Sequence, residues 1–239
     1  GNVGRAFANL LRRTRDSQNF RITAITTARH GSVFDQRGIE GEPKFGPAVT
    51  PVSEFLDRAR ADAVVEITTL NPASGEPAIS HIRAAFERNK HVVTANKGPI
   101  AHAYRALRDE ARRAEVEFRC EASVMDGAPV FNLVRHTLPG VRILGFRGVL
   151  NSTSKVIIDC MRQGLSMEDG VEQARRLGVT EADASYDIEG WDAAAKTAAL
   201  ANVLLDAGVT PLDIDRKGIG RLTTDKVLEL KANRKTVAL

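Results

Sequence analysis

The first half of the chain, up to about Cys120, alternates between amphipathic stretches and short runs of β-branched and other apolar residues. Apolar residues at helical spacing predict helices, and short β-branched runs between turn residues predict strands. The expected helices cover 6–15, a segment starting near Pro51 and Ser53, 76–89 and 101–114; the expected strands cover 20–27, 63–67, 91–94 and 116–120; a glycine-rich loop is expected over 31–46. Such successive βα units predict an α/β fold with a Rossmann-like, doubly wound parallel sheet.

After Cys120 the pattern changes. The segments expected there are a Gly/Pro turn at 126–129, a long strand over 142–150, mostly helical stretches through Ala207 and the start of another strand at 234–239. This pattern favours a second, α+β domain for substrate binding and dimerisation. We therefore place the two domains at 1–120 and 121–239.

Both ends of the chain interrupt a predicted feature. The chain opens with glycine inside what reads as a motif, and it closes in what reads as a new strand. We therefore expect the first domain to be truncated at its N-terminus and the second at its C-terminus.

Composition narrows the class of protein. Of the 239 residues 43% are hydrophobic, which is enough to bury one large core or two modest ones. The net charge is +4, but the basic residues are scattered among acidic ones without interleaved aromatics, which argues against nucleic-acid binding. Two distant cysteines, Cys120 and Cys160, indicate a reduced, cytoplasmic compartment, and no apolar stretch reaches the ~20 residues of a membrane span.

The first residues have the pattern of a phosphate-binding turn. Gly1, Asn2, Val3 and Gly4 lead directly into a predicted helix, as the second half of a G-x-G-x-x-G turn does. In such a turn the glycines allow close backbone approach, and the helix N-terminus offers free N–H groups to a pyrophosphate. An ordinary flexible chain end is the alternative. The repeated βα units favour the nucleotide turn.

Two further segments bear on the cofactor. About 20 residues beyond the turn, where NAD-binding folds carry an acidic residue, the chain has Arg29 and no carboxylate, which favours NADP over NAD. The alternative for Arg29 is a solvent-exposed basic loop. Thr68 and Thr69 follow the strand predicted at 63–67, where a loop would cover the nicotinamide; simple β-propensity is the alternative.

Three candidate catalytic or substrate-binding side chains lie near the middle of the second domain. Asp192 and Lys196 are four residues apart in an alanine-rich helical stretch and share one face, and Glu181 precedes them through a turn. From spacing alone, an exposed ion pair is the simpler interpretation. Lys97 follows a strand end beside the expected cofactor crevice, which suggests a functional role. The alternative interpretation is a solvated lysine on the surface.

Four segments, taken together, resemble homoserine dehydrogenases in order and spacing. They cover nearly the whole chain and are 92–97 (VVTANK), 121–129 (EASVMDGAP), 148–153 (GVLNST) and 177–196, which includes LGVTEAD, DIEGWD and Lys196. The resemblance implies an oxidoreductase that interconverts L-homoserine and L-aspartate 4-semialdehyde with NADP(H) or NAD(H), in the threonine and methionine branch of aspartate-derived amino-acid biosynthesis. It also implies a homodimer.

The resemblance assigns roles to individual residues. Lys196 becomes the proton-transfer residue, Lys97 a second catalytic or positioning residue, and Glu181 and Asp192 ligands of the substrate amino and hydroxyl groups. Asn151, Ser152 and Thr153 bind substrate or, alternatively, cap the helix that follows. The cofactor contacts expected in addition are Gly178, Glu181 and Lys97, whose ammonium could meet the substrate carboxylate or contact the nicotinamide side.

A cation site is also implied by the resemblance. Glu121 and the backbone carbonyls of Val124, Asp126 and Ala128 would hold a monovalent cation such as sodium or potassium, since oxygen ligands suit hard cations. Met125 and Asp126 depart from the commoner glycine-rich form of this segment. A linker with a helix N-cap is the alternative.

Two other functional classes stay open at this point. One is another amino-acid or semialdehyde dehydrogenase on the same scaffold. The other is an inactive fragment or a non-enzymatic binding module.

Overall fold

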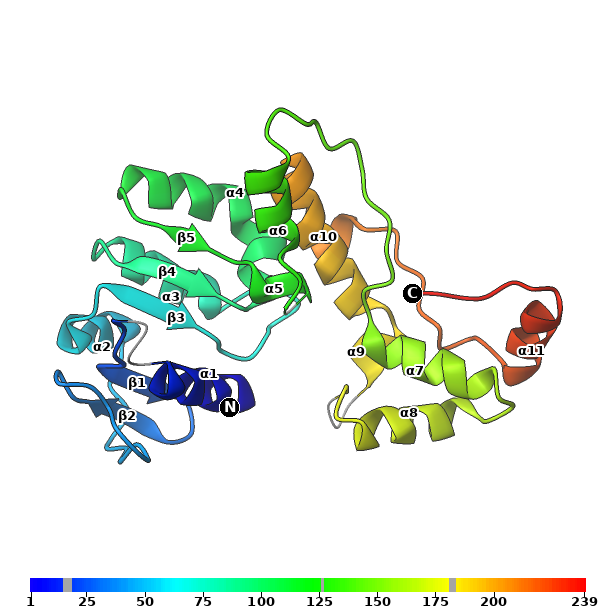
Figure 1. The fold of residues 1–239 in the computed structure, drawn as a ribbon, viewed down its shortest axis with the longest axis horizontal. Helices are drawn as coiled ribbons and strands as arrows, with labels where there is room; N and C mark the ends of the chain where they lie inside the picture. Colours follow the sequence, from blue (N-terminus) through cyan, green and yellow to red (C-terminus); the bar gives the residue numbers. More distant parts are fainter. Residues whose placement is uncertain (15–18, 126, 181–183) are drawn as a thin grey trace.

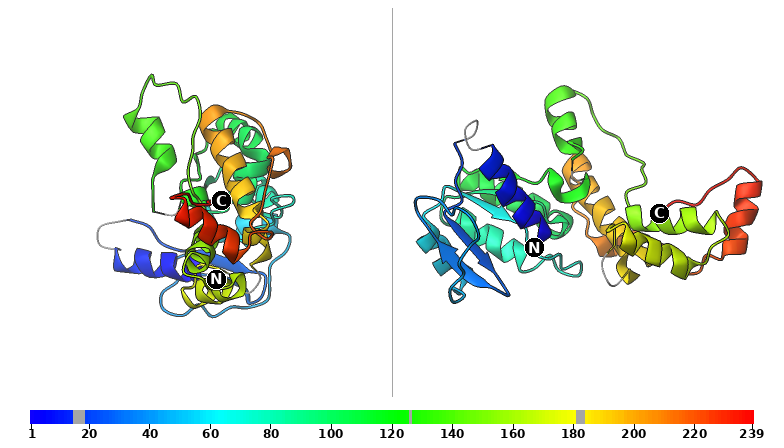
Figure 2. Two further views of the ribbon diagram at one scale, coloured as in Figure 1. Left: turned by 90° about the vertical axis from the view of Figure 1, so that its right-hand side faces the viewer. Right: turned by 60° about the horizontal axis from the view of Figure 1, so that its bottom comes forward.

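The protein is described by a computed structural model that covers residues 1–14, 19–125, 127–180 and 184–239. Its two halves differ in architecture (Figure 1). The N-terminal half contains the β-strands and flanking helices, whereas the C-terminal half is a group of helices joined to the first by the long helix α10 (Trp191–Leu205). The right-hand view of Figure 2 shows the same elongated arrangement, and the left-hand view looks along the long axis.

A three-stranded parallel sheet organises the N-terminal half. Its strands are β3 (Ala63–Glu66), β4 (His91–Thr94) and β5 (Phe118–Arg119), in the order β3-β4-β5. Helices α3 (Ala78–Phe86) and α4 (Lys97–Arg113) connect them as parallel crossovers. The Rossmann-like α/β prediction is confirmed, and β4 has the predicted bounds.

One face of this sheet carries the core. Ile82, Val92 and Leu107 are fully buried there and pack with Phe55 and Leu56 of α2 (Val52–Ala59). Burial of such side chains contributes about 1.5–3 kcal/mol each. On the opposite face Val65 and Val93 are exposed. The period-2 pattern of the strands therefore specifies which face the helices cover.

A hairpin lies where the sequence predicted a strand and a loop. Strand β1 (Ala24–Thr27) is shorter than expected, and β2 (Gly31–Phe34) pairs with it in antiparallel fashion. The prediction of a loop beginning at Gly31 was wrong. Gly31 has φ +85°, and a Cβ there would lie 2.0 Å from the carbonyl oxygen of Gly46, so glycine is required by close backbone packing inside a paired strand.

The C-terminal half confirms the helical prediction through Ala207. Its helices are α5 (Ala122–Met125), α6 (Val130–Asn132), the π-helical turn η1 (Leu133–Thr137), α7 (Ser152–Met161), α8 (Met167–Arg176), α9 (Ser185–Ile188), α10, the 3₁₀ turn η2 (Pro211–Asp213) and α11 (Thr224–Ala232). None of the helices in the described part of the chain combines the length and apolar character that a membrane crossing requires.

The two strands predicted for this half are not formed. Residues 142–150 run without regular structure, with Leu144 82% exposed, and residues 234–239 are likewise irregular. A strand requires a neighbouring backbone to complete its hydrogen bonds, and no described segment pairs with either stretch. The apolar residues in these two stretches suggested strands, but they do not tell whether a neighbouring strand is present to pair with them.

Helices α4 and α10 join the two halves. The contact face of α10 is built from small residues, including Ala194, Ala198 and Ala199, which allows the helices to approach closely. Helix α4 departs from helical geometry at Ala103, and the buried Asn202 of α10 donates to the carbonyl oxygens of Ile100 and Ala101 at 3.0 and 3.3 Å. The first turn of α4 is thus fixed relative to α10.

Helix α8 approaches α7 at a glycine, which makes a test of this packing possible. A Cβ on Gly170 would lie 2.8 Å from the Cα of Ile157. We expect Gly170→Ala to lower the free energy of unfolding by about 1–3 kcal/mol in urea denaturation, through overpacking. Helix propensity alone would raise the free energy of unfolding of the alanine variant by about 1 kcal/mol. The sign of the measured change therefore distinguishes overpacking from helix propensity.

Gly145→Ala is the matched control, because a Cβ there meets no atom within 4 Å and the segment is irregular. A Gly170→Ala variant that is more stable than the wild type by about 1 kcal/mol, the gain from helix propensity alone, would show that α7 and α8 can separate without cost.

Candidate active site

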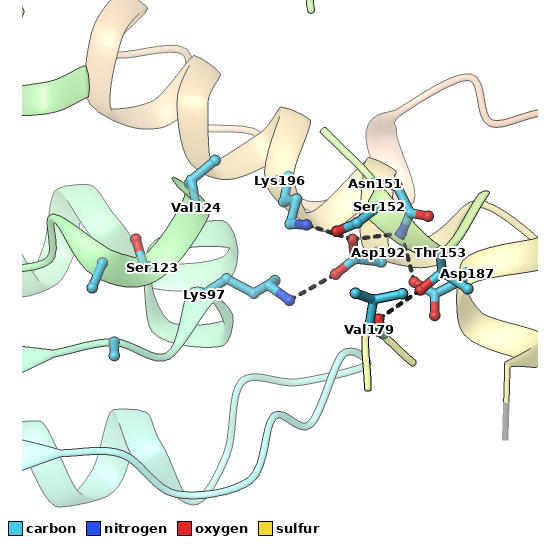
Figure 3. A pocket seen from close by; sticks show the side chains of 12 residues that line it. Lys97, Ser123, Val124, Asn151, Ser152, Thr153, Val179, Asp187, Asp192 and Lys196 are labelled. Atoms are coloured by element: carbon cyan, nitrogen blue, oxygen red, sulfur yellow. Dashed lines mark hydrogen bonds and ion pairs between the residues drawn. The ribbon is translucent and has the colours of Figure 1, made fainter. Parts of the chain in front are cut away.

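A polar cleft of about 270 Å³ opens at the junction of the two halves, beside the carboxyl end of β4 (Figure 3). Its walls come from the start of α4, from α5, from the start of α7 and from the first turns of α10. The residues lining it are Ala95, Lys97, Ala122, Ser123, Val124, Asn151, Ser152, Thr153, Val179, Asp187, Asp192 and Lys196. In open parallel α/β folds this edge of the sheet is where ligands bind.

Asp192 is the central group of the cleft. Its Oδ1 lies 2.7 Å from Nζ of Lys97, and its Oδ2 lies 2.8 Å from Nζ of Lys196. Asn151 donates to Oδ2 at 2.9 Å. Figure 3 shows the two lysines approaching the carboxylate from different elements, α4 and α10. The pair at positions 192 and 196 shares one helix face, as predicted from the spacing.

This pair is not the exposed surface pair that spacing alone favoured. The side chains of Asp192 and Lys196 are 13% and 15% exposed. Burial raises the pKa of the Asp192 carboxyl, but the neighbouring Lys97 and Lys196 ammonium groups more than offset it and bring the pKa to about 2. Asp192 is therefore ionised at neutral pH.

Lys196 has a second partner. Its Nζ donates to the carbonyl oxygen of Leu150 at 2.7 Å, just before α7 begins. Lys196 thus connects α10 to the segment that enters α7. Its ammonium group is held by a carboxylate and a carbonyl, so its position in the cleft is well defined.

Asn151 caps α7 and also shapes the cleft. Its Oδ1 accepts from the backbone N–H of Ser154 at 2.6 Å, while its Nδ2 donates to Asp187 at 2.5 Å and to Asp192. Capping and a place in the cleft, posed as alternatives from the sequence, coexist in one side chain. Ser152 and Thr153 also line the cleft, and the Thr153 hydroxyl donates to the carbonyl oxygen of Val179 at 2.9 Å.

Asp187 was missed as a candidate by the sequence analysis. It lines the cleft and accepts hydrogen bonds from Asn151 and from the Thr180 hydroxyl, the latter at 3.2 Å. A signal was available, since Asp187 lies in the same acidic segment as Asp192. The two lie five positions apart, which is not a helical repeat, and the break between α9 and α10 brings them together.

The residues predicted to hold a cation, Glu121, Val124 and Ala128, lie on the segment that leads into α6. Both carboxylate oxygens of Glu121 accept backbone N–H groups at the start of α6, from Phe131 at 2.9 Å and Asn132 at 3.0 Å. Glu121 thus satisfies two N–H groups of α6, although the N-cap residue of this helix is Pro129. Val124 lines the cleft, and the N–H of Ala128 donates to the Met125 carbonyl at 2.7 Å.

Two predicted site residues, Asp126 and Glu181, lie outside the described residues. Within the described ranges, no group of three or more His, Cys, Asp or Glu side chains is placed to hold a metal ion.

Comparison with known proteins identifies the family. The family model described as homoserine dehydrogenase matches residues 129–239, and that described as the homoserine dehydrogenase NAD binding domain matches residues 1–121. The homoserine dehydrogenase of Methanocaldococcus jannaschii is 36% identical over the whole chain, which spans 77% of that protein. This chain belongs to the homoserine dehydrogenase family.

Other members extend the comparison. An NAD(+)-dependent homoserine dehydrogenase from Pseudomonas canavaninivorans is 38% identical over 95% of this chain and 70% of its own length. A solved structure from Archaeoglobus fulgidus matches with a TM-score of 0.87 at 28% identity, covering 100% of this chain and 76% of that one. The homoserine dehydrogenase of Thermoplasma acidophilum gives a TM-score of 0.78 at 25% identity, covering 90% and 69%. The resemblance inferred from sequence motifs is confirmed.

In this homoserine dehydrogenase family member, helix α1 (Asn2–Arg13) begins near the end of β3. Gly1, Asn2 and Val3 are exposed. A Cβ on Gly4 would lie 3.1 Å from Cδ1 of Ile67, so the helix packs closely beside the end of β3. A helix N-terminus at such an edge is a position that could hold a pyrophosphate.

Four further predicted cofactor residues, Arg29, Thr68, Thr69 and Gly178, do not line the cleft. Arg29 lies exposed at the turn between β1 and β2. Thr68 and Thr69 are exposed after β3, and the Thr68 hydroxyl donates to Glu66. Gly178 follows α8 with φ +69° and is exposed.

The lowered pKa of Asp192 predicts a pH-dependent contribution to stability. Because the folded-state pKa of about 2 is below the ordinary value of 3.8, the contribution is present above about pH 4 and is lost as the pH falls through 2. Its size is about 2 kcal/mol. We expect the difference in unfolding free energy between wild type and Asp192→Asn, measured in urea, to shrink by that amount between pH 5 and pH 2.

Asp159→Asn removes an exposed i,i+4 partner of Lys155 and serves as the control, with an expected change within a few tenths of a kcal/mol. A wild type and an Asp192→Asn variant with parallel pH profiles would contradict the assignment.

Proposed function

We propose that this protein interconverts L-homoserine and L-aspartate 4-semialdehyde by hydride transfer with a nicotinamide cofactor. The observation that carries the proposal is the convergence of Lys97 and Lys196 on Asp192, in a cleft beside the carboxyl end of β4. Family membership supports the substrate, and it disfavours another dehydrogenase on this scaffold. The threonine and methionine branch of aspartate-derived amino-acid biosynthesis is the corresponding metabolic role.

Lys196 is proposed as the proton-transfer residue. The cofactor, when bound, supplies or accepts the hydride at the carbon that bears the oxygen. In the reducing direction the Lys196 ammonium gives a proton to the aldehyde oxygen, which becomes the hydroxyl of homoserine; in the oxidising direction the neutral amine takes that proton back. Asp192 and the Leu150 carbonyl hold Nζ in place for either step.

The rest of the cleft suits an amino-acid substrate. We propose that Lys97 meets the substrate carboxylate, while Asp192, with Glu181, binds the amino and hydroxyl groups. Asp187 adds negative charge on the same side, held by Asn151 and Thr180. Ser152 and Thr153 lie at the N-terminus of α7, which favours an anionic group of the substrate.

NADP is proposed as the preferred cofactor, with NAD as the alternative. Support comes from Arg29, which occupies the turn after β1 where an NAD-binding fold has a carboxylate. The relative described as NAD(+)-dependent favours the alternative. In either case residues 1–4 would hold the pyrophosphate, and Thr68, Thr69, Gly178 and Glu181 would contact the cofactor near its reactive end.

Three further expectations complete the proposal. A sodium or potassium ion at the 121–128 segment, held by the Glu121 carboxylate and the backbone carbonyls of Val124, Asp126 and Ala128, is expected from the resemblance, and such an ion would share the carboxylate with the N–H groups of α6. A homodimer through the second half is supported by exposed apolar side chains at Val141, Leu144 and Val149. A cytoplasmic location stays an expectation from cysteine usage.

Substitution of the lysines tests the catalytic assignment. We expect Lys196→Ala to lower kcat for NADP-dependent homoserine oxidation by about 10²–10⁴-fold, because a positioned proton-transfer group contributes that much. Lys97→Ala should raise KM for homoserine and lower kcat as well. The measurement is steady-state absorbance of the reduced nicotinamide.

Lys155→Ala removes a lysine from an exposed i,i+4 pair on α7 and is the control. Full turnover by the Lys196→Ala variant would refute its proton role. A wild-type protein without any turnover would favour the non-enzymatic alternative.

Cofactor preference is tested at Arg29. If its guanidinium pairs with a 2′-phosphate, Arg29→Ala should raise KM for NADP about tenfold, in keeping with ~1.5 kcal/mol for a charged hydrogen bond, and leave KM for NAD unchanged. Arg37→Ala, also exposed and close to the same hairpin, is the matched control. Equal changes with both cofactors would exclude 2′-phosphate recognition by Arg29.

A further inference from the structure

A buried carboxylate lies at the end of β3, outside the cleft. Glu66 is 4% exposed and pairs in register with the fully buried Thr94 of β4. Its Oε2 accepts from the Thr94 hydroxyl at 2.7 Å. Its Oε1 accepts from the hydroxyl and the backbone N–H of Thr68, at 2.5 and 2.8 Å. Glu66 was not among the site residues predicted from the sequence.

These bonds belong to a closed ring of four residues. The N–H of Asn96 donates to the Thr94 hydroxyl oxygen at 3.0 Å, and the Asn96 side-chain Nδ2 donates to the carbonyl oxygen of Thr68 at 3.3 Å. The ring therefore runs Glu66, Thr94, Asn96, Thr68 and back to Glu66. It connects the segment after β3 to the turn after β4.

The ring ends directly at Lys97. Asn96 is the N-cap of α4, and its Oδ1 accepts from the N–H of Gly98 at 3.0 Å. Lys97 is the first residue of that helix, so the backbone of Asn96 sets the direction in which the Lys97 side chain leaves. Lys97 then reaches Asp192, 95 residues later in the chain, at 2.7 Å.

We propose that Glu66 is a positioning residue, which through this ring holds the start of α4 so that the Lys97 ammonium meets Asp192 in the cleft. The expected effect of Glu66 on turnover rests on the function proposed above. Glu66 does not line the cleft, so it acts through Lys97 and not on the substrate.

The chemistry of the ring favours a carboxylate at this position. Three donors, two hydroxyls and one N–H, point at two oxygen atoms, and an ionised acceptor forms shorter and stronger bonds than a neutral one. An apolar residue at position 66 would leave the buried Thr94 hydroxyl without its acceptor, so the segment would rearrange.

The surroundings hold the ring in place. A Cβ on Gly75, whose φ is +73°, would lie 2.9 Å from the carbonyl oxygen of Gly98, and His102 Nε2 lies 2.9 Å from the carbonyl oxygen of Pro72. The segment after β3 thus packs along the first turns of α4 at three levels. A change in the ring is transmitted to Lys97 because the contacts leave little room for independent adjustment.

The first test needs no turnover. Thr94→Val removes both ring bonds of the hydroxyl and keeps the side-chain shape. We expect the carboxyl of Asp192, titrated by carbon-13 NMR in the full protein, to shift from its low pKa of about 2 upward by about one unit, because Lys97 no longer stays beside it.

Thr23→Val is the matched control, since that hydroxyl donates to the Ala59 carbonyl away from the site, and Asp192 should titrate there as in the wild type. An unchanged Asp192 titration in the Thr94→Val variant would overturn the proposal, whether or not the protein oxidises homoserine.

The second test is kinetic. We expect Thr94→Val to lower kcat for homoserine oxidation about tenfold, and Glu66→Ala to lower it further; Glu66→Gln, which keeps an acceptor for Thr68, should recover part of the loss. In a Lys97→Ala background Thr94→Val should cost nothing more, because coupled residues are not additive.

A loss that is as large without Lys97 as with it would overturn the proposal, as would equal losses in the Glu66→Gln and Glu66→Ala variants. If Glu66→Ala does not fold, Thr94→Val and Glu66→Gln still decide it. A wild type without turnover contradicts the proposed function alone, since the NMR titration of Asp192 still reports on the ring.

Discussion

The cleft depends on one interaction, the double ion pair that the Asp192 carboxylate makes with the ammonium groups of Lys97 and Lys196. Lys97 and Lys196 are both largely shielded from water, and without the carboxylate they would face each other as like charges. Asp192 contacts a different lysine with each oxygen and accepts a third bond from Asn151. One side chain therefore fixes the relative positions of α4, α7 and α10.

That arrangement requires the two halves of the molecule to be held together, because Lys97 comes from the sheet half and Asp192 from α10. The small residues of α10 let it lie close to α4. The departure from helical geometry at Ala103 leaves carbonyl oxygens that the buried Asn202 amide satisfies. The ion pair thus depends on helix packing, in which apolar burial and one satisfied amide act together.

Lys97 links the carboxyl edge of the parallel sheet to the cleft. On one side the ring of Glu66, Thr94, Asn96 and Thr68 joins the ends of β3 and β4. On the other side Lys97 reaches into the cleft. Lys97 is the first residue of the crossover helix α4. The pairing of β4 fixes its backbone, and its side chain still projects beyond the sheet.

Elements with a local pattern were predictable from the sequence: β4 with its bounds, the helices through Ala207, the common face of Asp192 and Lys196, and the motifs of the homoserine dehydrogenase family. Three features became visible in the folded chain: β2 pairs where glycines suggested a loop, residues 142–150 form no strand, and Lys97, Asp187 and Glu66 belong to connected polar networks. The difference lies in the distance along the chain over which each interaction acts. Periodicity reports which face of a segment is apolar, whereas strand partners, ion pairs and buried hydrogen bonds join residues separated by tens of positions.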